Sequence, residues 1–107
     1  MAISINNSLS RRTQNQQEKT QEIEEQLERL EEDIRRLKIS FDIYFNGGTK
    51  KAPHRDRASL EARIKRINGN RDLSYASRYK LNNLISRYTS FRELWRRKLK
   101  AKGEEIY

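Results

Sequence analysis

The sequence predicts an all-α chain, in which a long N-terminal heptad-patterned helix packs against a C-terminal amphipathic helix with a short bracing helix between them. Two apolar patterns of helical period, one in each half of the chain, support this fold. Short segments rich in glycine and asparagine separate the two patterns. Of the 107 residues, 34% are apolar and 36% are charged, so the chain forms at most one domain with a small core.

The N-terminal part divides into an arm and a long helix. Residues 1–15 are polar and aperiodic, and we expect a flexible arm there. Residues 16–45 should form a helix about 45 Å long. Its apolar stripe recurs at alternating spacings of four and three residues and comprises Ile23, Leu27, Leu30, Ile34, Leu37, Phe41 and Tyr44. The helix should end at Gly47 and Gly48, because glycine readily adopts the left-handed conformation.

This stripe has two interpretations, and the sequence leaves both open. The candidate helix-pairing residues are Ile23, Leu27, Leu30, Ile34 and Leu37. They can join two chains in a coiled coil, most simply a homodimer, or pack within one chain against the C-terminal helix. We expect residues 34–44 to pack within the chain, because their aromatic side chains are large for the narrow interface between the helices of a coiled coil. The acidic residues 23–30 should then project and pair between chains.

A basic loop and a short helix follow. Residues 46–57 form the loop, which contains the one proline of the chain, Pro53. The helix should span residues 58–67, and Glu61 precedes Lys65 by four positions, the favourable order for an ion pair.

The C-terminal helix should span residues 74–101, capped by Asp72 or Ser74. Its apolar residues fall within an arc of roughly 120°. They are Leu81, Leu84, Ile85, Tyr88, Phe91, Trp95 and Leu99. We expect residues 103–107 to fray, so that a single helical domain covers residues 16–102.

Charge is divided unevenly along the chain. Residues 1–49 contain seven Lys and Arg against nine Asp and Glu, a net charge of −2. Residues 50–102 contain seventeen basic against four acidic residues, a net charge of +13. Such an imbalance favours contact with a polyanion or an acidic protein surface.

Twelve basic residues are candidates for polyanion binding. They are Lys50, Lys51, Arg55, Arg57, Arg63, Lys65, Arg66, Arg96, Arg97, Lys98, Lys100 and Lys102. Such a set can neutralise phosphates and release their counterions, although a solvated helix face has the same composition. No helix-turn-helix, zinc-finger or RNA-binding-sheet pattern is present, so sequence-specific readout has no support. We expect the polyanion to be RNA or a ribonucleoprotein surface rather than a specific DNA sequence. Tyr75 and Tyr79 point away from the apolar arc and could stack on an external group.

The alternative function is a coiled-coil scaffold that self-associates and binds an acidic protein. A purely electrostatic contact with a membrane surface is a third and weaker hypothesis. No apolar run approaches the roughly 20 residues of a membrane span, and we expect no integral membrane association. Without a secretory signal pattern, we expect a cytoplasmic location.

Catalysis has little support in the sequence. The chain has no cysteine, which excludes disulfides and thiolate metal sites. His54 is the one histidine, and its position in the basic loop indicates a solvated residue. We therefore predict a non-enzymatic protein with no catalytic residues, no metal and no cofactor.

Several segments of the chain together suggest a family resemblance. They are FDIYFNGG at residues 41–48, Pro53, the apolar face of residues 60–67, RYKLNNLISRY at residues 78–88 and FRELWRR at residues 91–97. In these segments the chain resembles a family of short, basic, helical bacterial domains of unknown function. It covers roughly residues 34–100. The resemblance implies a helical fold and assigns neither an activity nor functional residues.

Overall fold

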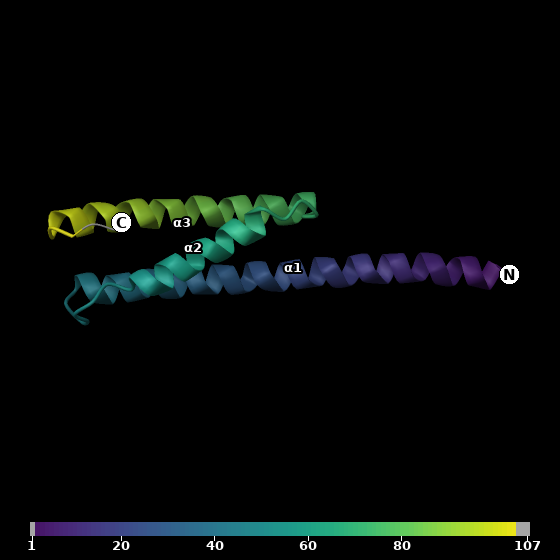
Figure 1. The fold of residues 1–107 in the computed structure, drawn as a ribbon, viewed down its shortest axis with the longest axis horizontal. Helices are drawn as coiled ribbons and strands as arrows, with labels where there is room; N and C mark the ends of the chain where they lie inside the picture. Colours follow the sequence, from purple (N-terminus) through teal and green to yellow (C-terminus); the bar gives the residue numbers. More distant parts are fainter. Residues whose placement is uncertain (1, 105–107) are drawn as a thin grey trace.

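The structure is a computed structural model that describes the backbone of residues 2–104 and the side chains of residues 18–104. It contains the helices α1 (Ala2–Phe45), α2 (His54–Asn68) and α3 (Tyr75–Ala101), and no strand among the described residues. The prediction of an all-α chain is therefore confirmed. α2 runs back diagonally between the other two helices, so that α1 and α3 point in the same direction (Figure 1). The molecule is a rod of 72 × 20 × 18 Å.

α1 differs from the expected helix at its N-terminal end. It begins at Ala2 rather than near residue 16, so residues 2–15 of the predicted arm are helical. This stretch has no glycine or proline to stop a helix, and its Gln, Arg and Ser residues are compatible with one. The heptad stripe indicates where a helix packs, not where it begins. Met1 lies outside the described residues.

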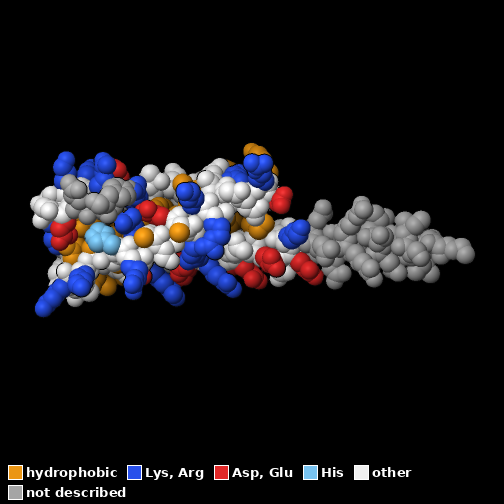
Figure 2. All heavy atoms as spheres, viewed as in Figure 1, with side chains coloured by type: hydrophobic (Ala, Val, Ile, Leu, Met, Phe, Trp, Pro, Cys, Tyr) orange, Lys and Arg blue, Asp and Glu red, His pale blue; other side chains and the backbone are white. Residues whose placement is uncertain are grey.

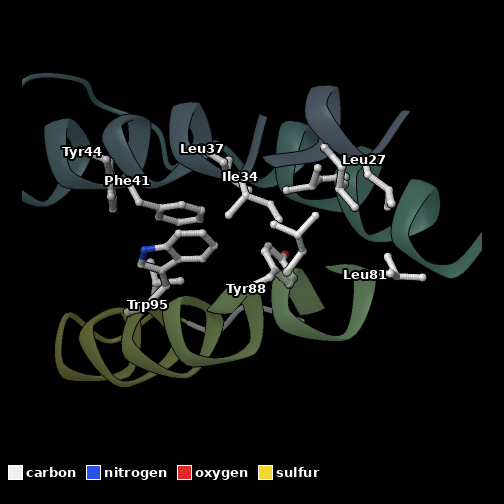
Figure 3. Packing of buried hydrophobic residues seen from close by; sticks show 12 residues of the cluster. Leu27, Ile34, Leu37, Phe41, Tyr44, Leu81, Tyr88 and Trp95 are labelled. Atoms are coloured by element: carbon white, nitrogen blue, oxygen red, sulfur yellow. The ribbon is translucent and has the colours of Figure 1, made fainter. Parts of the chain in front are cut away.

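A single apolar core joins the three helices. Its buried members are Leu27, Leu30, Ile34, Leu37, Phe41 and Tyr44 of α1, Leu60 of α2, and Leu81, Leu84, Tyr88, Trp95 and Leu99 of α3. Four of the five buried apolar residues of α3 follow a buried residue of α1 at one constant interval, as in Leu81 after Leu27 and Trp95 after Phe41. Two parallel helices with matched heptads produce this constant interval. Figure 3 shows the two rows facing each other.

The acidic half of the stripe does not project, contrary to our expectation. Leu27 and Leu30 are only 1% and 0% exposed within one chain, and Ile23 is half-buried against the same core. α3 has 27 residues and so extends about 40 Å alongside α1. Because α3 runs parallel to α1, its first turns cover this half. Pairing between chains through Leu27 and Leu30 would require α3 to move away.

α1 and α3 end in the same type of cap. Gly47 and Gly103 have positive φ values of 82° and 81°. The next residue in each case donates its backbone N–H to a carbonyl five positions back, at 2.8 Å for both Gly48 and Glu104. This is the hydrogen-bond pattern of a Schellman motif. The cap therefore holds residues 103 and 104 of the segment that we expected to fray, and residues 105–107 lie outside the described part.

α2 begins four residues earlier than we expected. Pro53 occupies its N-cap position, and the Pro53 carbonyl accepts a hydrogen bond from the backbone N–H of Arg57 at 3.0 Å. Proline suits the start of a helix because no backbone N–H is needed there. His54 is therefore a half-buried helical residue and not a solvated loop residue. Its ring forms a T-shaped pair with that of Phe41 at a centroid distance of 6.4 Å.

The turn between α2 and α3 is held by side chains. Ser74 caps α3, because its Oγ accepts a hydrogen bond from the backbone N–H of Ser77 at 3.1 Å. The guanidinium of Arg78 donates to the backbone carbonyls of Asn68 and Asn70 at 3.2 and 2.9 Å. These contacts fix where α3 starts and therefore its alignment along α1.

Candidate polyanion-binding surface

The two most basic segments of the chain meet at one end of the rod. α1 and α3 end there side by side, and the loop of residues 46–53 leaves the last turn of α1 (Figure 1). The Tyr44 hydroxyl donates a hydrogen bond of 2.6 Å to a carboxylate oxygen of Glu104, which joins the two helix ends directly. Parallel alignment of α1 and α3 thus brings together residues that are about fifty positions apart in the sequence.

Seven basic side chains on these segments are exposed and make no ion pair with any described residue. They are Lys50, Lys51, Arg55, Arg97, Lys98, Lys100 and Lys102, and we call this group the basic end. Basic side chains gather at this end of the rod in Figure 2. Two carboxylates on the adjoining turns have other partners, since Asp42 binds Lys38 at 2.9 Å and Glu93 binds Arg96 at 3.1 Å.

Aromatic rings of α1 support two members of the basic end. The Lys102 Nζ lies 4.1 Å from the ring centroid of Tyr44, and the Lys98 Nζ lies 5.2 Å from that of Phe45. These are cation–π distances, and they hold the two ammonium groups over the junction of the helices. The partial negative charge at two helix C-termini also favours cations here.

The remaining candidate residues do not all join this group. Lys65 and Arg66 are exposed on the last turn of α2, where Arg66 lines a surface hollow with Gln26. Gln26 lies about 30 Å along α1 from the end of that helix. Arg63 forms an ion pair with Asp33 of α1. Seven of the twelve residues therefore form the basic end, and Lys65 and Arg66 lie apart from them. Arg63 and Arg96 are in ion pairs with Asp33 and Glu93, a division that the sequence alone did not reveal.

Arg57 is a correction to the predicted set. Its side chain is buried, only 8% exposed, and its guanidinium binds Glu61 at 3.1 Å. A phosphate on the surface cannot reach it without opening the helix packing. The burial arises because α2 begins early, which turns Arg57 from a loop residue into a helical residue on the inner face.

Glu61 is the centre of a half-buried network that the sequence analysis missed. One of its oxygens accepts a hydrogen bond from the Tyr88 hydroxyl at 2.6 Å and lies 3.0 Å from the Arg92 Nε. The ion pair expected with Lys65 is replaced by the pair with Arg57, four positions earlier on the same helix. Arg57 and Lys65 both lie four positions from Glu61 in the sequence, but only the folded chain shows which of the two is on the inner side of α2.

The surroundings of Glu61 shift two pKa values. Burial by itself would raise the pKa of Glu61, but hydrogen bonds from Tyr88 and Arg57 and the charges of Arg57 and Arg92 outweigh it and lower that pKa. Burial and the hydrogen bond to Glu61 raise the pKa of Tyr88. Because the pKa of Glu61 is lower in the folded state, its stabilising effect is present above its ordinary pKa and is lost as the pH falls through the folded value.

We expect Glu61→Gln to lower the free energy of unfolding by about 1–3 kcal/mol at neutral pH, because two arginines then lose their carboxylate partner. The variant should also lose less stability than the wild type on acidification. Urea denaturation at several pH values measures both effects. Glu93→Gln is the matched control, since its pair with Arg96 is exposed and contributes little. Equal stability of the Glu61 and Glu93 variants would contradict the role of this network.

The described residues offer no metal centre, because no three His, Asp or Glu side chains among them converge. No helix in the described part of the chain is long and apolar enough to cross a membrane. Comparisons with protein-family models, curated proteins and solved structures found no significant match to this chain.

Proposed function

We propose that this protein is a non-enzymatic, basic helical binding module that contacts a polyanion, with RNA or a ribonucleoprotein surface as the preferred partner. The observation that carries the proposal is the basic end, where seven exposed cations that pair with no described carboxylate come from two segments far apart in the sequence. The hydrogen bond between Tyr44 and Glu104 joins the two helix ends, and this packing brings the two basic segments together.

The physical basis of binding is the release of counterions. Phosphates along a nucleic-acid strand hold condensed cations, and each lysine or arginine that replaces one of them releases it to solution. A lysine side chain has a flexible stem and binds phosphate as a point charge, which does not require the planar, two-point geometry of an arginine contact. The basic end therefore suits a ligand with closely spaced phosphates more than one demanding sequence readout.

The alternative partner is an acidic protein. The basic end fits that partner electrostatically, but the homodimer interface expected for a scaffold is less supported. Leu27 and Leu30, which would form it, are covered by the same chain. We therefore favour the polyanion, and the test below separates the two.

The test is the salt dependence of RNA binding by the full chain. We expect an unstructured single-stranded RNA to bind with a log–log salt slope that grows by about 0.7 for each phosphate contact. Four to seven contacts would give a slope of roughly −3 to −5. Fluorescence anisotropy of labelled RNA at several salt concentrations measures it. Affinity that is unchanged between low and moderate salt would reject the proposal. Purification of the protein from its own cells with nuclease treatment separates the alternative, because recovery of a bound protein and no nucleic acid would favour an acidic protein partner and would also reject the proposal.

A further inference from the structure

The outward face of α3 begins with two exposed aromatic side chains. Tyr75 is 90% exposed and Tyr79 is 65% exposed. Neither has a hydrogen bond or ring contact with any described residue, whereas Tyr44 and Tyr88 are both buried and hydrogen-bonded. Being four residues apart on one helix, the two exposed tyrosines are neighbours on the same side. Tyrosines that contribute nothing to the core are typical of binding surfaces.

This face continues along the helix to the basic end. Helical spacing aligns Tyr75 and Tyr79 with Asn82, Ser86, Arg97 and Lys100, all exposed and all opposite the buried row that contains Trp95. The one carboxylate on this line, Glu93, is bound by Arg96 at 3.1 Å. From Tyr75 to Lys100 the face is about 38 Å long. It thus presents aromatic rings, then amide and hydroxyl groups, and finally cations.

Single-stranded nucleic acid is chemically complementary to these groups in the order in which they occur along α3. Its unpaired bases have free π-faces that stack on tyrosine, and its backbone supplies regularly spaced phosphates. A duplex has the same phosphates but hides its base faces, and a polyanion without bases offers nothing to the tyrosines. In Figure 2, apolar and basic side chains also lie together at the N-terminal end of α3, so the aromatic end is not isolated from positive charge.

We infer that the outward face of α3 is a binding track for single-stranded nucleic acid, in which Tyr75 and Tyr79 stack on bases while Arg97 and Lys100 bind phosphates. The inference rests on the proposed function and adds to it a preference for unpaired bases.

The test compares two ligands of equal charge on the full-length protein. One is a single-stranded oligothymidine of about 12 nucleotides, and the other is an abasic deoxyribose-phosphate oligomer of the same length. We expect the wild type to bind the oligothymidine about tenfold to 100-fold more tightly. The double variant Tyr75→Ala and Tyr79→Ala should bind the two oligomers equally. The matched variant Tyr75→Phe and Tyr79→Phe should keep the preference, because it retains both rings.

Each outcome distinguishes this inference from the proposed function. If neither oligomer binds at low salt, the proposed function fails and the inference fails with it. If the wild type binds both oligomers equally, polyanion binding stands and only the base-stacking track is overturned. A third outcome is that the wild type binds both oligomers equally while the double alanine variant loses a protein partner that the wild type retains. That result would assign this face to a protein and would also overturn the base-stacking track. Both tyrosines are exposed, so circular dichroism should show an unchanged fold.

Discussion

Replacing Phe41 with alanine should lower the free energy of unfolding by about 3–5 kcal/mol, the cost of a large cavity in a well-packed core. Phe41 is 0% exposed and stacks on Trp95 with a centroid distance of 4.1 Å and an interplanar angle of 16°. This stack joins α1 to α3, and Phe91 and Tyr88 contact the same indole at 6.1 and 5.9 Å. Folded domains are stable by only about 5–15 kcal/mol, so the variant should be close to unfolding.

The measurement is urea denaturation, followed by far-ultraviolet circular dichroism and by the fluorescence of Trp95, the one tryptophan of the chain. We expect the indole emission of the variant to shift to the red, because water then reaches the ring. Ile39→Ala is the control on the same helix, since that side chain is 45% exposed and should change stability by less than about 1 kcal/mol. An unchanged midpoint for Phe41→Ala would contradict the core described above.

Removing four charges from the basic end should weaken RNA binding by roughly two to three orders of magnitude at 0.1 M salt. The variant carries Gln in place of Lys50, Lys51, Arg97 and Lys100. These residues are exposed and make no ion pair or ring contact with a described residue, so the fold should not change. If each makes one phosphate contact, the salt slope should also become shallower by about 2.8.

Much of the architecture could be predicted from the sequence, because helical periodicity and chemical stop signals are local. α3 runs from Tyr75 to Ala101, one residue from the expected start, since Ser74 is the cap and Gly103 follows the end. The apolar arc around Trp95 is likewise the buried face of α3. The exposure of Tyr75 and Tyr79 follows from the same helical projection, because both lie outside the apolar arc.

Features that depend on how the helices meet could not be predicted. Leu27 and Leu30 are buried because α3 runs parallel to α1, and no local sequence pattern encodes the relative direction of the two helices. The same arrangement brings Lys50 to the same end as Lys100 and leaves Lys65 on the far end of α2. Burial of Arg57 depends on where α2 begins and on which of its faces meets the core, and a charge count treats all arginines alike.

The most direct test of the account compares the basic-end variant with a second variant of equal net charge. The second replaces Arg29, Lys65, Arg66 and Arg87 with Gln. These four residues are exposed, form no ion pair within the described part of the chain, and lie along the middle of the rod. RNA affinity and salt slope are measured for both by fluorescence anisotropy. We predict that the basic-end variant loses most of its affinity while the second keeps most of it. Equal losses in both variants would mean that net charge alone governs binding, and would contradict a polyanion-binding surface at the joined ends of α1 and α3.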